Sequence, residues 1–429
     1  MDKFIVKGGN KLTGDIYVSG AKNAAVAIIP AVILSDEPCI LENVPKISDV
    51  SISFKILHEM GATVEMIDST TFRIDASHLS NYVVPYEMAR KMRASYYFLG
   101  ACLGKYRKAM VSLPGGCSLA LGDRPIDQHL KAFAALGAKC EQDNGMVNVE
   151  SDFLYGNQIY FDVVSVGATM NAMLASVKAQ GLTIIENAAK EPHIVDLANF
   201  LNSMGAEIMG AGTDVIKVRG VGYLKGTTYS IIPDQIEAGT YMIATAATSG
   251  DVVVHNVIPK HLESITAKLR KIGVNVDEFD DSVRVWVDKP LVKTNVKTMP
   301  HPGFPTDMQP QIATLLTLAQ GTSIITEGIW DSRFKYVEEL RRMGANISVE
   351  GRAAIIEGTD KLKGAPVRAC DLRAGAALII AGLAAEGITE IEEIHYIERG
   401  YEDMDKKLRG IGAAIEKRYF PGEPVAKSC

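Results

Sequence analysis

Hydrophobic residues recur along the chain in blocks about seventy residues apart, and each block contains one segment that is apolar on nearly all sides. These segments are rich in small residues, and their few polar residues stand at the beginning. Such a pattern is typical of a helix buried on every side. We therefore predict six buried helices, in the segments SGAKNAAVAIIPAVILS, MARKMRASYYFLGACLG, SVGATMNAMLASVKAQG, IEAGTYMIATAATSG, TDMQPQIATLLTLAQG and DLRAGAALIIAGLAAEG.

Each block also contains a helix pattern that ends in glycine and leads into a strand pattern, as in LHEMGATVE and LRRMGANIS. Glycine suits this place because it adopts the left-handed backbone conformation that ends many helices. The period is longer than the ~20–50 residues typical of solenoids, which indicates six copies of a compact βα unit. The six glycines are Gly61, Gly137, Gly205, Gly273, Gly344 and Gly412.

The repeat predicts two domains of three units each, and a chain of 429 residues is too long for one ordinary core. We expect residues 1-20 plus 231-429 to form one domain and residues 21-230 to form the other. The strand pattern before Ser19 has no partner of its own in the first half. It is expected to pair with the second half.

Composition narrows the class of protein. No apolar stretch reaches the about 18 residues of a membrane span, and the N-terminus does not resemble a signal peptide, so we expect a cytoplasmic protein without a membrane partner. The net charge of −6 and the lack of a lysine or arginine tract argue against a nucleic-acid surface. Six cysteines without CxxC spacing and eight histidines without ligand spacing imply neither a disulfide scaffold nor a metal.

Cationic residues recur at equivalent places of the repeat. The starts of the buried helices attract anions through their unpaired N–H groups, and the loops that follow these helices contribute further arginines. Each arginine taken alone is more often a solvated surface charge, but their recurrence favours a cluster that holds a phosphate and a carboxylate. The helix starts carry Lys22, Asn23, Arg93, Asp371 and Arg373, and the loops carry Arg124, Arg333 and Arg399.

Two further side chains are candidates for proton transfer. Asp307, in FPTDMQPQ, can cap its helix; if Thr306 caps instead, Asp307 can accept a proton from a substrate hydroxyl. Cys117 stands on a Gly-Gly turn in LPGGCSLALGDRP, where nearby cations would favour its thiolate. We interpret Cys39, Cys102, Cys140 and Cys370 as small buried hydrophobic residues and Cys429 as incidental.

The motifs SGAKNAA, LPGGC followed by RPIDQH, FPTDMQPQ and DLRAGAALIIAGL together resemble the UDP-N-acetylglucosamine 1-carboxyvinyltransferase family of enolpyruvyl transferases. The resemblance runs from KFIVKGGNKLTG to IERGYEDMDKKL. It implies an α/β fold of two inside-out α/β barrel domains, each of three βαβαββ repeats, with a cleft between them. It further implies transfer of the enolpyruvyl group of phosphoenolpyruvate to the 3′-hydroxyl of UDP-N-acetylglucosamine with release of phosphate, in peptidoglycan synthesis, without a cofactor.

The resemblance also implies roles for individual residues. Cys117 would be the general acid towards C3 of phosphoenolpyruvate and the site of alkylation by fosfomycin, and Asp307 would take the proton of the sugar hydroxyl. Lys22, Arg124 and Arg399 would hold the anionic donor. The remaining substrate contacts that it implies are Asn23, Arg93, Pro125, Ile126, Asp127, Gln128, Ile329, Arg333, Asp371 and Arg373.

One departure and three alternatives stand beside this interpretation. The family usually reads GGCxxGxRP, whereas CSLALGDRP places two extra residues between Cys117 and Arg124. The sister enzyme on the same fold, 5-enolpyruvylshikimate-3-phosphate synthase, lacks the LPGGC cysteine. A catalytically quiet paralogue that binds the UDP sugar is the second alternative, and a thiol-based redox sensor, which would need a resolving cysteine near Cys117, is the third.

Overall fold

The computed structural model describes residues 2–89, 91–112, 126–143 and 145–419, and these form two compact units. Unit 1 comprises residues 2–18 and 234–419, and unit 2 comprises the described residues between 19 and 233. The chain therefore passes from one unit to the other at Val18–Ser19 and again at Pro233–Asp234. No helix of the described residues is long and apolar enough to cross a membrane.

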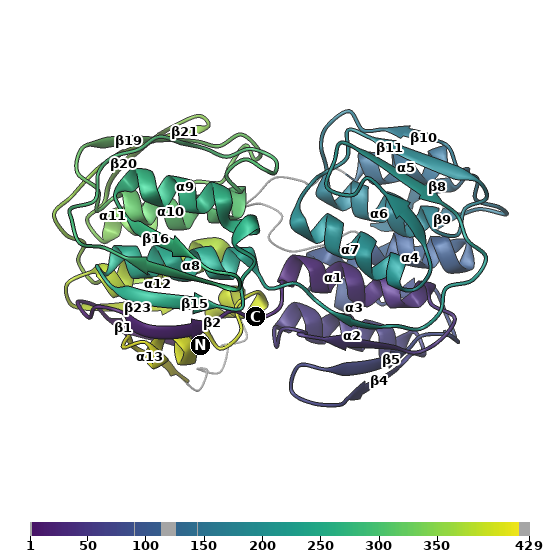
Figure 1. Ribbon diagram of the computed structural model, residues 1–429, viewed down its shortest axis with the longest axis horizontal. Coiled ribbons are helices and arrows are strands. Elements are labelled where there is room, and N and C mark those ends of the chain that lie inside the picture. Colours follow the sequence, from purple (N-terminus) through teal and green to yellow (C-terminus); the bar gives the residue numbers. More distant parts are fainter. Residues whose placement is uncertain (1, 90, 113–125, 144, 420–429) are drawn as a thin grey trace, which may run out of the picture. The chain divides into compact units, whose positions relative to one another are not determined.

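Unit 2 contains three successive repeats in which helices and strands alternate before a closing pair of strands (Figure 1). The first repeat contains α1 (Lys22–Ala31), β3 (Cys39–Glu42), α2 (Ser48–Glu59), β4 (Thr63–Met66) and β5 (Phe72–Asp75). The second contains β6 (Val83–Val84), α3 (Tyr86–Ala89), η2 (Arg93–Tyr96), α4 (Tyr97–Tyr106), β7 (Lys108–Ser112), α5 (Asp127–Ala135), β8 (Lys139–Asp143) and β9 (Met146–Glu150). The third contains β10 (Gln158–Tyr160), α6 (Val166–Ser176), β11 (Leu182–Glu186), α7 (Pro192–Ser203), β12 (Glu207–Met209) and β13 (Val215–Arg219), and is followed by β14 (Thr228–Ser230).

Unit 1 repeats the same order of elements. Its first repeat contains α8 (Gln235–Ala247), β15 (Asp251–His255), α9 (Glu263–Ile272), β16 (Asn275–Glu278) and β17 (Ser282–Trp286). The second contains β18 (Val296–Lys297), η4 (Thr306–Met308), α10 (Gln309–Leu316), β19 (Thr322–Thr326), α11 (Val337–Arg342), β20 (Asn346–Glu350) and β21 (Ala353–Glu357). The third contains β22 (Pro366–Arg368), α12 (Leu372–Ala384), β23 (Ile388–Glu392), η5 (Ile394–Arg399), α13 (Met404–Gly410) and β24 (Ala414–Arg418).

Every repeat builds a four-stranded sheet in which one parallel pair is extended by antiparallel strands, as in β6-β7-β9-β8. In four of these sheets the connection between the two parallel strands contains the buried helix, because a parallel crossover needs a connection of that length. Two repeats lack a first strand of their own. β14 completes the first repeat's sheet beside β3, and β2 (Thr13–Tyr17) completes the fourth repeat's sheet beside β15.

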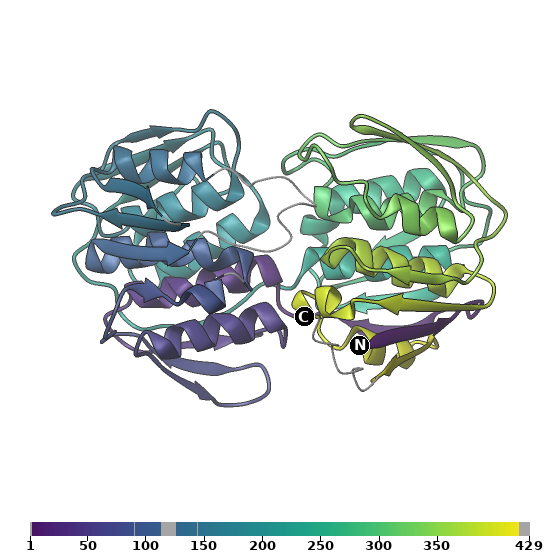
Figure 2. The same ribbon diagram turned by 180° about the vertical axis from the view of Figure 1, so that it is seen from behind.

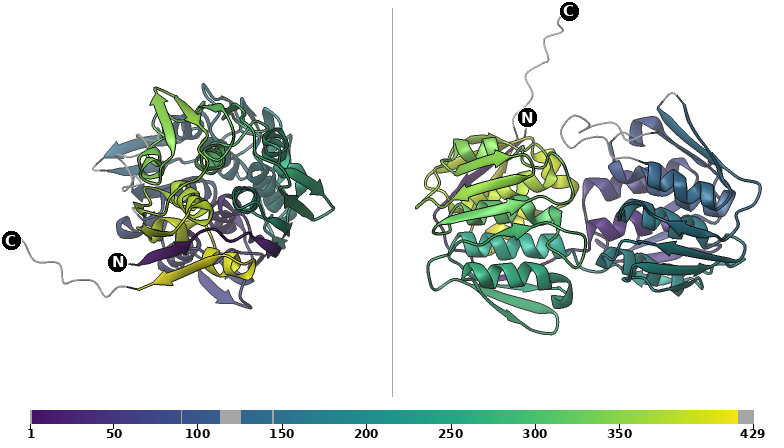
Figure 3. Two further views of the ribbon diagram at one scale, coloured as in Figure 1. Left: turned by 90° about the vertical axis from the view of Figure 1, so that its left-hand side faces the viewer. Right: turned by 90° about the horizontal axis from the view of Figure 1, so that it is seen from above.

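The N-terminal strands confirm the expected pairing with the second half of the chain. β1 (Lys3–Lys7) lies antiparallel between β23 and β24, where Figures 2 and 3 show the purple strand beside the yellow C-terminal strand. β1 and β2 both belong to unit 1, and β1 lies inside the sheet of the last repeat. That repeat therefore also needs residues from the beginning of the chain to complete its sheet.

The six expected buried helices are α1, α4, α6, α8, α10 and α12, and nearly all of their residues are inaccessible to solvent. In unit 2, α4 packs against α1 and α6, and in unit 1 α8, α10 and α12 pack against one another, so helices form the centre of each unit. The packing is close: a Cβ at Gly100 would lie 2.4 Å from Oδ1 of Asn171. The six helix-ending glycines all have positive φ angles, between 92° and 104°, as predicted.

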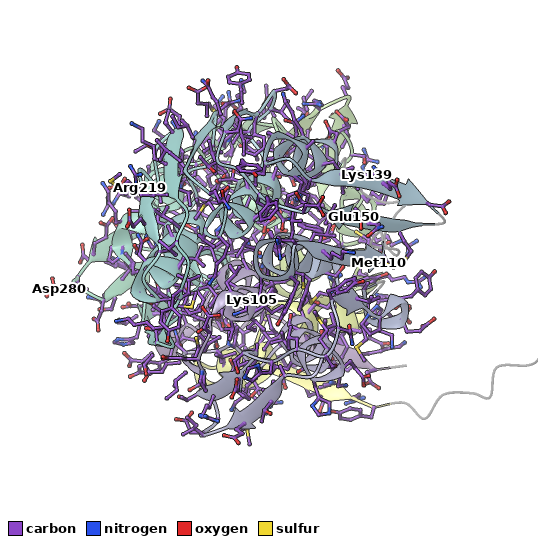
Figure 4. The ribbon with its side chains drawn as sticks, turned by 90° about the vertical axis from the view of Figure 1, so that its right-hand side faces the viewer. Lys105, Met110, Lys139, Glu150, Arg219 and Asp280 are labelled. Carbon is purple, nitrogen blue, oxygen red and sulfur yellow. The ribbon has the colours of Figure 1, made fainter. Side chains whose placement is uncertain are left out.

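Polar groups also join the repeats of unit 2. Asp36, which follows α1, accepts hydrogen bonds from Lys105 at the end of α4 and, at 3.0 Å, from Lys178 after α6. Figure 4 labels Lys105 together with Met110, Lys139 and Glu150. The last three residues belong to the sheet of the second repeat, in which Lys139 on β8 pairs with Glu150 on β9. The Asp36 carboxylate thus links the C-terminal ends of the three buried helices α1, α4 and α6.

Candidate active site

Asp307 in unit 1 is held between two arginines from different loops and helices. Nη2 of Arg333, on the loop between β19 and α11, donates a hydrogen bond to its Oδ1 at 2.9 Å. Nη2 and Nε of Arg373, in the first turn of α12, donate to its Oδ2 at 3.1 and 3.3 Å. The sequence-predicted residues Asp307, Arg333 and Arg373 therefore form one cluster, in which an anion lies between two cations.

Both guanidinium groups are buried, with 6% of Arg333 and 3% of Arg373 exposed, whereas 28% of the Asp307 side chain is exposed. Burial by itself would raise the pKa of the Asp307 carboxyl, but the charges of Arg373 and Arg333 outweigh it and hold that pKa far below its usual range. Burial would lower the pKa of Arg373, and the charge of Asp307 reverses this too. The cluster is therefore fully ionised at neutral pH.

The two arginines also retain hydrogen-bonding capacity. Among the described residues, Nε of Arg333 and Nη1 of Arg373 are buried and have no hydrogen-bond acceptor. An arginine has five N–H donors in a fork that fits a carboxylate or a phosphate. The cluster can therefore bind an anionic ligand in addition to Asp307.

The capping roles differ from both sequence-based interpretations of Thr306 and Asp307. Neither Thr306 nor Asp307 makes a side-chain cap at η4 or α10, so the hypothesis that one of them caps this helix is wrong. Thr306 instead donates its hydroxyl to Glu327, 3.0 Å away. Asp371 is the residue that caps: its Oδ1 accepts from the N–H groups of Arg373 and Ala374 at 2.8 and 2.9 Å, which fixes the first turn of α12.

A buried polar network lies beside Arg373, and sequence analysis did not identify its members as site residues. The Cζ atom of Arg373 lies 5.4 Å from the ring centroid of Tyr401. The Tyr401 hydroxyl is 2.9 Å from Oγ1 of Thr240, and Nε2 of Gln311 donates to both at 3.2 Å. Gln311 stands in FPTDMQPQ, inside an otherwise apolar helix, and that position was the available signal.

The other two predicted residues of unit 1 lie on loops of the same repeats. Ile329 follows β19, and its N–H donates to Oε1 of Glu327 at 2.9 Å. Arg399 is the last residue of η5 and is half-buried. Ile329 and Arg333 thus share one loop, whereas Arg399 comes from the third repeat of the unit.

In unit 2, Lys22 is the first residue of α1, and its Nζ lies 3.0 Å from Oδ2 of Asp49. Asp49 is in the first turn of α2 and only 1% exposed, so the helix start holds a buried carboxylate opposite the lysine. Asn23 follows on α1 and is half-buried. Asp49 was not identified from the sequence, although it stands in the recurring loop segment LENVPKISDV.

The segment before α5 contains the remaining predicted contacts. Ile126 precedes the helix, Asp127 is exposed at its start, and Gln128 is 5% exposed. Nε2 of Gln128 donates to Asp127 at 2.9 Å and to Asp162 at 3.1 Å, while its Oε1 accepts from the N–H of Asp162 at 3.1 Å. Gln128 therefore holds the start of α5 against the segment that follows β10.

Arg93 begins η2, but its side chain lies outside the described structure. Cys117, Arg124 and Pro125 also lie outside the described residues. Within the described part of the chain, no group of three or more His, Cys, Asp or Glu side chains is arranged to hold a metal ion. The chemistry that this part of the site can supply is anion binding and proton transfer.

The chain is similar to known carboxyvinyltransferases along nearly its whole length. Residues 6–408 match the family model of EPSP synthase (3-phosphoshikimate 1-carboxyvinyltransferase). The chain is 57% identical over 416 residues to UDP-N-acetylglucosamine 1-carboxyvinyltransferase of Clostridium botulinum, which covers 97% of this chain and 99% of that protein. It is 56% identical over 415 residues to UDP-N-acetylglucosamine 1-carboxyvinyltransferase 3 of Caldanaerobacter subterraneus, with the same coverage.

Solved structures show the same fold. The enolpyruvyl transferase NikO from Streptomyces tendae superposes with a TM-score of 0.89 at 26% identity, covering 98% of this chain and 99% of that one. EPSP synthase from Acinetobacter baumannii superposes with a TM-score of 0.77 at 19% identity, covering 98% of this chain and 100% of that one. The two inside-out α/β domains implied by the resemblance are therefore confirmed as those of an enolpyruvyl transferase fold.

Proposed function

The chain belongs to the family of UDP-N-acetylglucosamine 1-carboxyvinyltransferases, and we propose that the cluster of Arg333, Asp307 and Arg373 is where the acceptor hydroxyl loses its proton. The enzyme transfers the enolpyruvyl group of phosphoenolpyruvate to the 3′-hydroxyl of UDP-N-acetylglucosamine and releases phosphate, as the first committed step of peptidoglycan synthesis. The observation that carries the proposed site is a partly exposed carboxylate between two buried arginines that keep unused donors.

The proposed reaction involves proton transfers at Cys117 and Asp307. The Cys117 thiol gives its proton to C3 of phosphoenolpyruvate, which makes C2 electrophilic. The 3′-hydroxyl oxygen of the sugar bonds to C2, and its proton passes to Asp307. Phosphate then leaves C2 with its electron pair, one proton of C3 returns to the Cys117 thiolate to restore the double bond, and Asp307 gives its proton to the released phosphate. Positive side chains stabilise the negative charge on the leaving phosphate.

Asp307 can act as a base only if its ion pairs with Arg333 and Arg373 weaken, because a carboxylate with so low a pKa accepts protons poorly. Phosphoenolpyruvate carries a carboxylate and a phosphate, and both compete for guanidinium groups. Donor binding at Arg333 or Arg373 would therefore raise the pKa of Asp307 towards its ordinary value. In this proposal, binding of phosphoenolpyruvate makes Asp307 a stronger base for the 3′-hydroxyl of the UDP sugar.

The other roles are proposals from the same resemblance. Lys22, Arg124 and Arg399 would hold the anionic donor, and Asn23 and Arg93 would help to bind the ligands. Residues 124–128 with Ile329 would contact the UDP sugar. The start of α5 supports a role for Asp127, which is exposed, whereas the Gln128 amide is already bonded within the protein. Asp371 would act through its cap, by orienting Arg373. Cytoplasmic location and the absence of nucleic-acid and membrane partners stay predictions.

The alternative is the sister reaction with shikimate 3-phosphate as acceptor, because the chain matches the family model of EPSP synthase. The test is phosphate release from phosphoenolpyruvate with either acceptor, by wild type and Cys117→Ser. We expect release only with UDP-N-acetylglucosamine, and its loss in the variant. Cys140→Ser is the matched control, because burial raises the pKa of that thiol to about 11 and keeps it unreactive.

Two results would contradict the proposal. Release with shikimate 3-phosphate alone would reassign the acceptor, and binding of the UDP sugar without turnover would indicate a quiet paralogue. A mass measurement after treatment with fosfomycin locates the reactive thiol independently. We expect one adduct on Cys117 and none on Cys140; near-normal turnover of Cys117→Ser would show that the longer loop uses another acid.

A further inference from the structure

Glu327, the residue that follows β19, has a buried carboxylate with an unusual set of partners. It is 1% exposed, and among the described residues no cation lies within ion-pair distance of it. Its oxygens accept hydrogen bonds from three donors instead, one hydroxyl and two backbone N–H groups. The Thr306 hydroxyl lies 3.0 Å from both oxygens, and the N–H groups of Ile329 and Trp330 lie 2.9 and 3.2 Å from Oε1.

These bonds join two segments of the site. The bonds to Ile329 and Trp330 close a tight turn directly after β19, so Glu327 sets the conformation of the loop that continues to Arg333. The bond from Thr306 holds the residue immediately before Asp307. The backbone of Glu327 is itself fixed, because its N–H donates to the carbonyl of Arg352 at 2.8 Å.

Burying a carboxylate without a counterion costs free energy unless hydrogen bonds compensate for the lost water. Packing alone therefore does not explain why a glutamate occupies this position. An apolar side chain of the same length would fill the same space. The neighbouring turn is also tied to β18 through Gly328, whose N–H donates to Oγ1 of Thr298 at 2.8 Å. The carboxylate therefore adds a link that the sheet alone does not supply: the link to Thr306.

We propose that Glu327 is a positioning residue for the enolpyruvyl transfer, in which one carboxylate sets both the backbone before Asp307, through Thr306, and the turn that presents Ile329. The inference rests on the proposed function for the roles of Asp307 and Ile329. It makes Glu327 an acceptor of hydrogen bonds only, so its charge takes no part in the chemistry.

The variants separate the two links. Thr306→Val keeps the shape of the side chain and removes only the bond to Glu327, so we expect kcat to fall about tenfold while KM for the UDP sugar changes less than about twofold. Thr306→Ser retains the hydroxyl and should restore most of kcat. Thr248→Val removes a hydroxyl that bonds only within α8 and its end, and it serves as the matched control.

Glu327→Met removes every acceptor at nearly constant length, so both kcat and affinity for the UDP sugar should fall. Glu327→Gln keeps an acceptor oxygen for the two N–H groups and should retain most of both. Thermal unfolding of each variant shows how much folded enzyme is present, and kcat is then calculated per folded molecule. A purely structural role would lower the unfolding temperature of Thr306→Val and leave this kcat unchanged.

An optical measurement tests the turn without turnover. The chain has two tryptophans, and in a Trp286→Phe background the emission reports on Trp330 alone. We expect Glu327→Met to shift that emission, and Glu327→Gln and Thr306→Val to leave it near the wild-type position. An unchanged emission in Glu327→Met would overturn the role in the turn.

Failure of the inference and failure of the proposed function give different results. If wild type releases no phosphate with UDP-N-acetylglucosamine, the proposed function is wrong, and the emission of Trp330 still tests the turn. If wild type is active and Thr306→Val has wild-type kcat, the link to Asp307 is refuted. Equal loss of activity in Glu327→Gln and Glu327→Met would also refute it, because the charge would then be the essential property.

Discussion

Asp307 and Arg373 are 66 positions apart in the chain, yet Oδ2 of Asp307 accepts hydrogen bonds from both Nε and Nη2 of Arg373. The aspartate precedes α10 and the arginine lies in the first turn of α12, and these two helices pack against each other in the centre of unit 1. The starts of two buried helices therefore meet, and each contributes one charge of an ion pair. The repeat places this pair where an anionic ligand can share the arginine.

Replacing Asp307 by asparagine tests its role as the proton acceptor. Asp307→Asn keeps the size of the side chain but removes the group that takes the hydroxyl proton, so kcat should fall by about 10²–10⁴-fold. Steady-state phosphate release measures it. Asp251→Asn, which removes the carboxylate of an exposed ion pair with Arg284, should leave kcat unchanged. An active Asp307→Asn would exclude Asp307 as the base.

Replacing Asp49 tests whether the ion pair orients Lys22. Asp49→Asn removes the charge opposite the lysine but keeps a hydrogen-bond acceptor, so a contact that orients Lys22 is weakened. We expect KM for phosphoenolpyruvate to rise about tenfold, since one charge-assisted contact to the donor contributes about that much, with a smaller change in kcat. Initial rates at varied donor concentration measure both. A KM equal to that of wild type would show that the Asp49 charge does not orient Lys22 for the donor.

The stability of the protein should depend on pH through Asp196. Burial raises the pKa of this carboxyl to about 6, although hydrogen bonds from the Tyr229 hydroxyl and the Ile232 N–H lower it. The folded-state pKa thus exceeds the unfolded-state value of about 4, so the folded protein binds the proton more tightly. Its stabilising contribution is complete below about pH 4 and is lost as the pH rises through about 6.

Asp196→Asn should therefore raise the free energy of unfolding at pH 8 by about 3 kcal/mol relative to wild type, and the difference should shrink towards pH 4. Urea unfolding followed by circular dichroism at both pH values measures this. Asp280→Asn, in an exposed hairpin turn that Figure 4 labels, is the control and should change stability at neither pH. A variant less stable than wild type at pH 8 would contradict the prediction.

The close packing of α4 and α6 predicts an asymmetric response to alanine. Gly100→Ala would bring a Cβ to 2.4 Å from Oδ1 and 2.8 Å from the carbonyl oxygen of Asn171, so the helices must separate, at a cost of about 1–3 kcal/mol. Gly410→Ala meets no atom within 4 Å on α13 and should be neutral or stabilising by up to about 1 kcal/mol. Thermal unfolding compares the two. Equal midpoints would show that α4 and α6 can move apart freely.

Local physical chemistry explains which features could be predicted from the sequence. The apolar segments, the glycines that end helices and the polar residues at helix starts all reflect preferences acting within a few residues. They were sufficient to predict six buried helices, the repeat, and the position of Asp307, Arg333 and Arg373 at helix starts and loops of the repeat. The motifs that resemble a known family gave the reaction, which the relatives bear out.

Other features depend on contacts between distant residues, and no local pattern announces them. Nothing in the sequence near Glu327 or Asp49 says that each would be buried against Thr306 or Lys22. The cap hypothesis for Thr306 failed for the same reason, because its hydroxyl donates to the distant Glu327 and does not accept from a helix N–H.

The sequence by itself determined the units of the fold and the chemical kinds of residue in the site. Tertiary structure decided which residues meet: it placed β2 and β14 in sheets of distant repeats, packed α10 against α12, and so turned three isolated charges into one ion-pair cluster. The physical reason is that a side chain's local preferences are set by its own segment, whereas the pKa of Asp307 is set by charges that only packing brings within hydrogen-bonding distance.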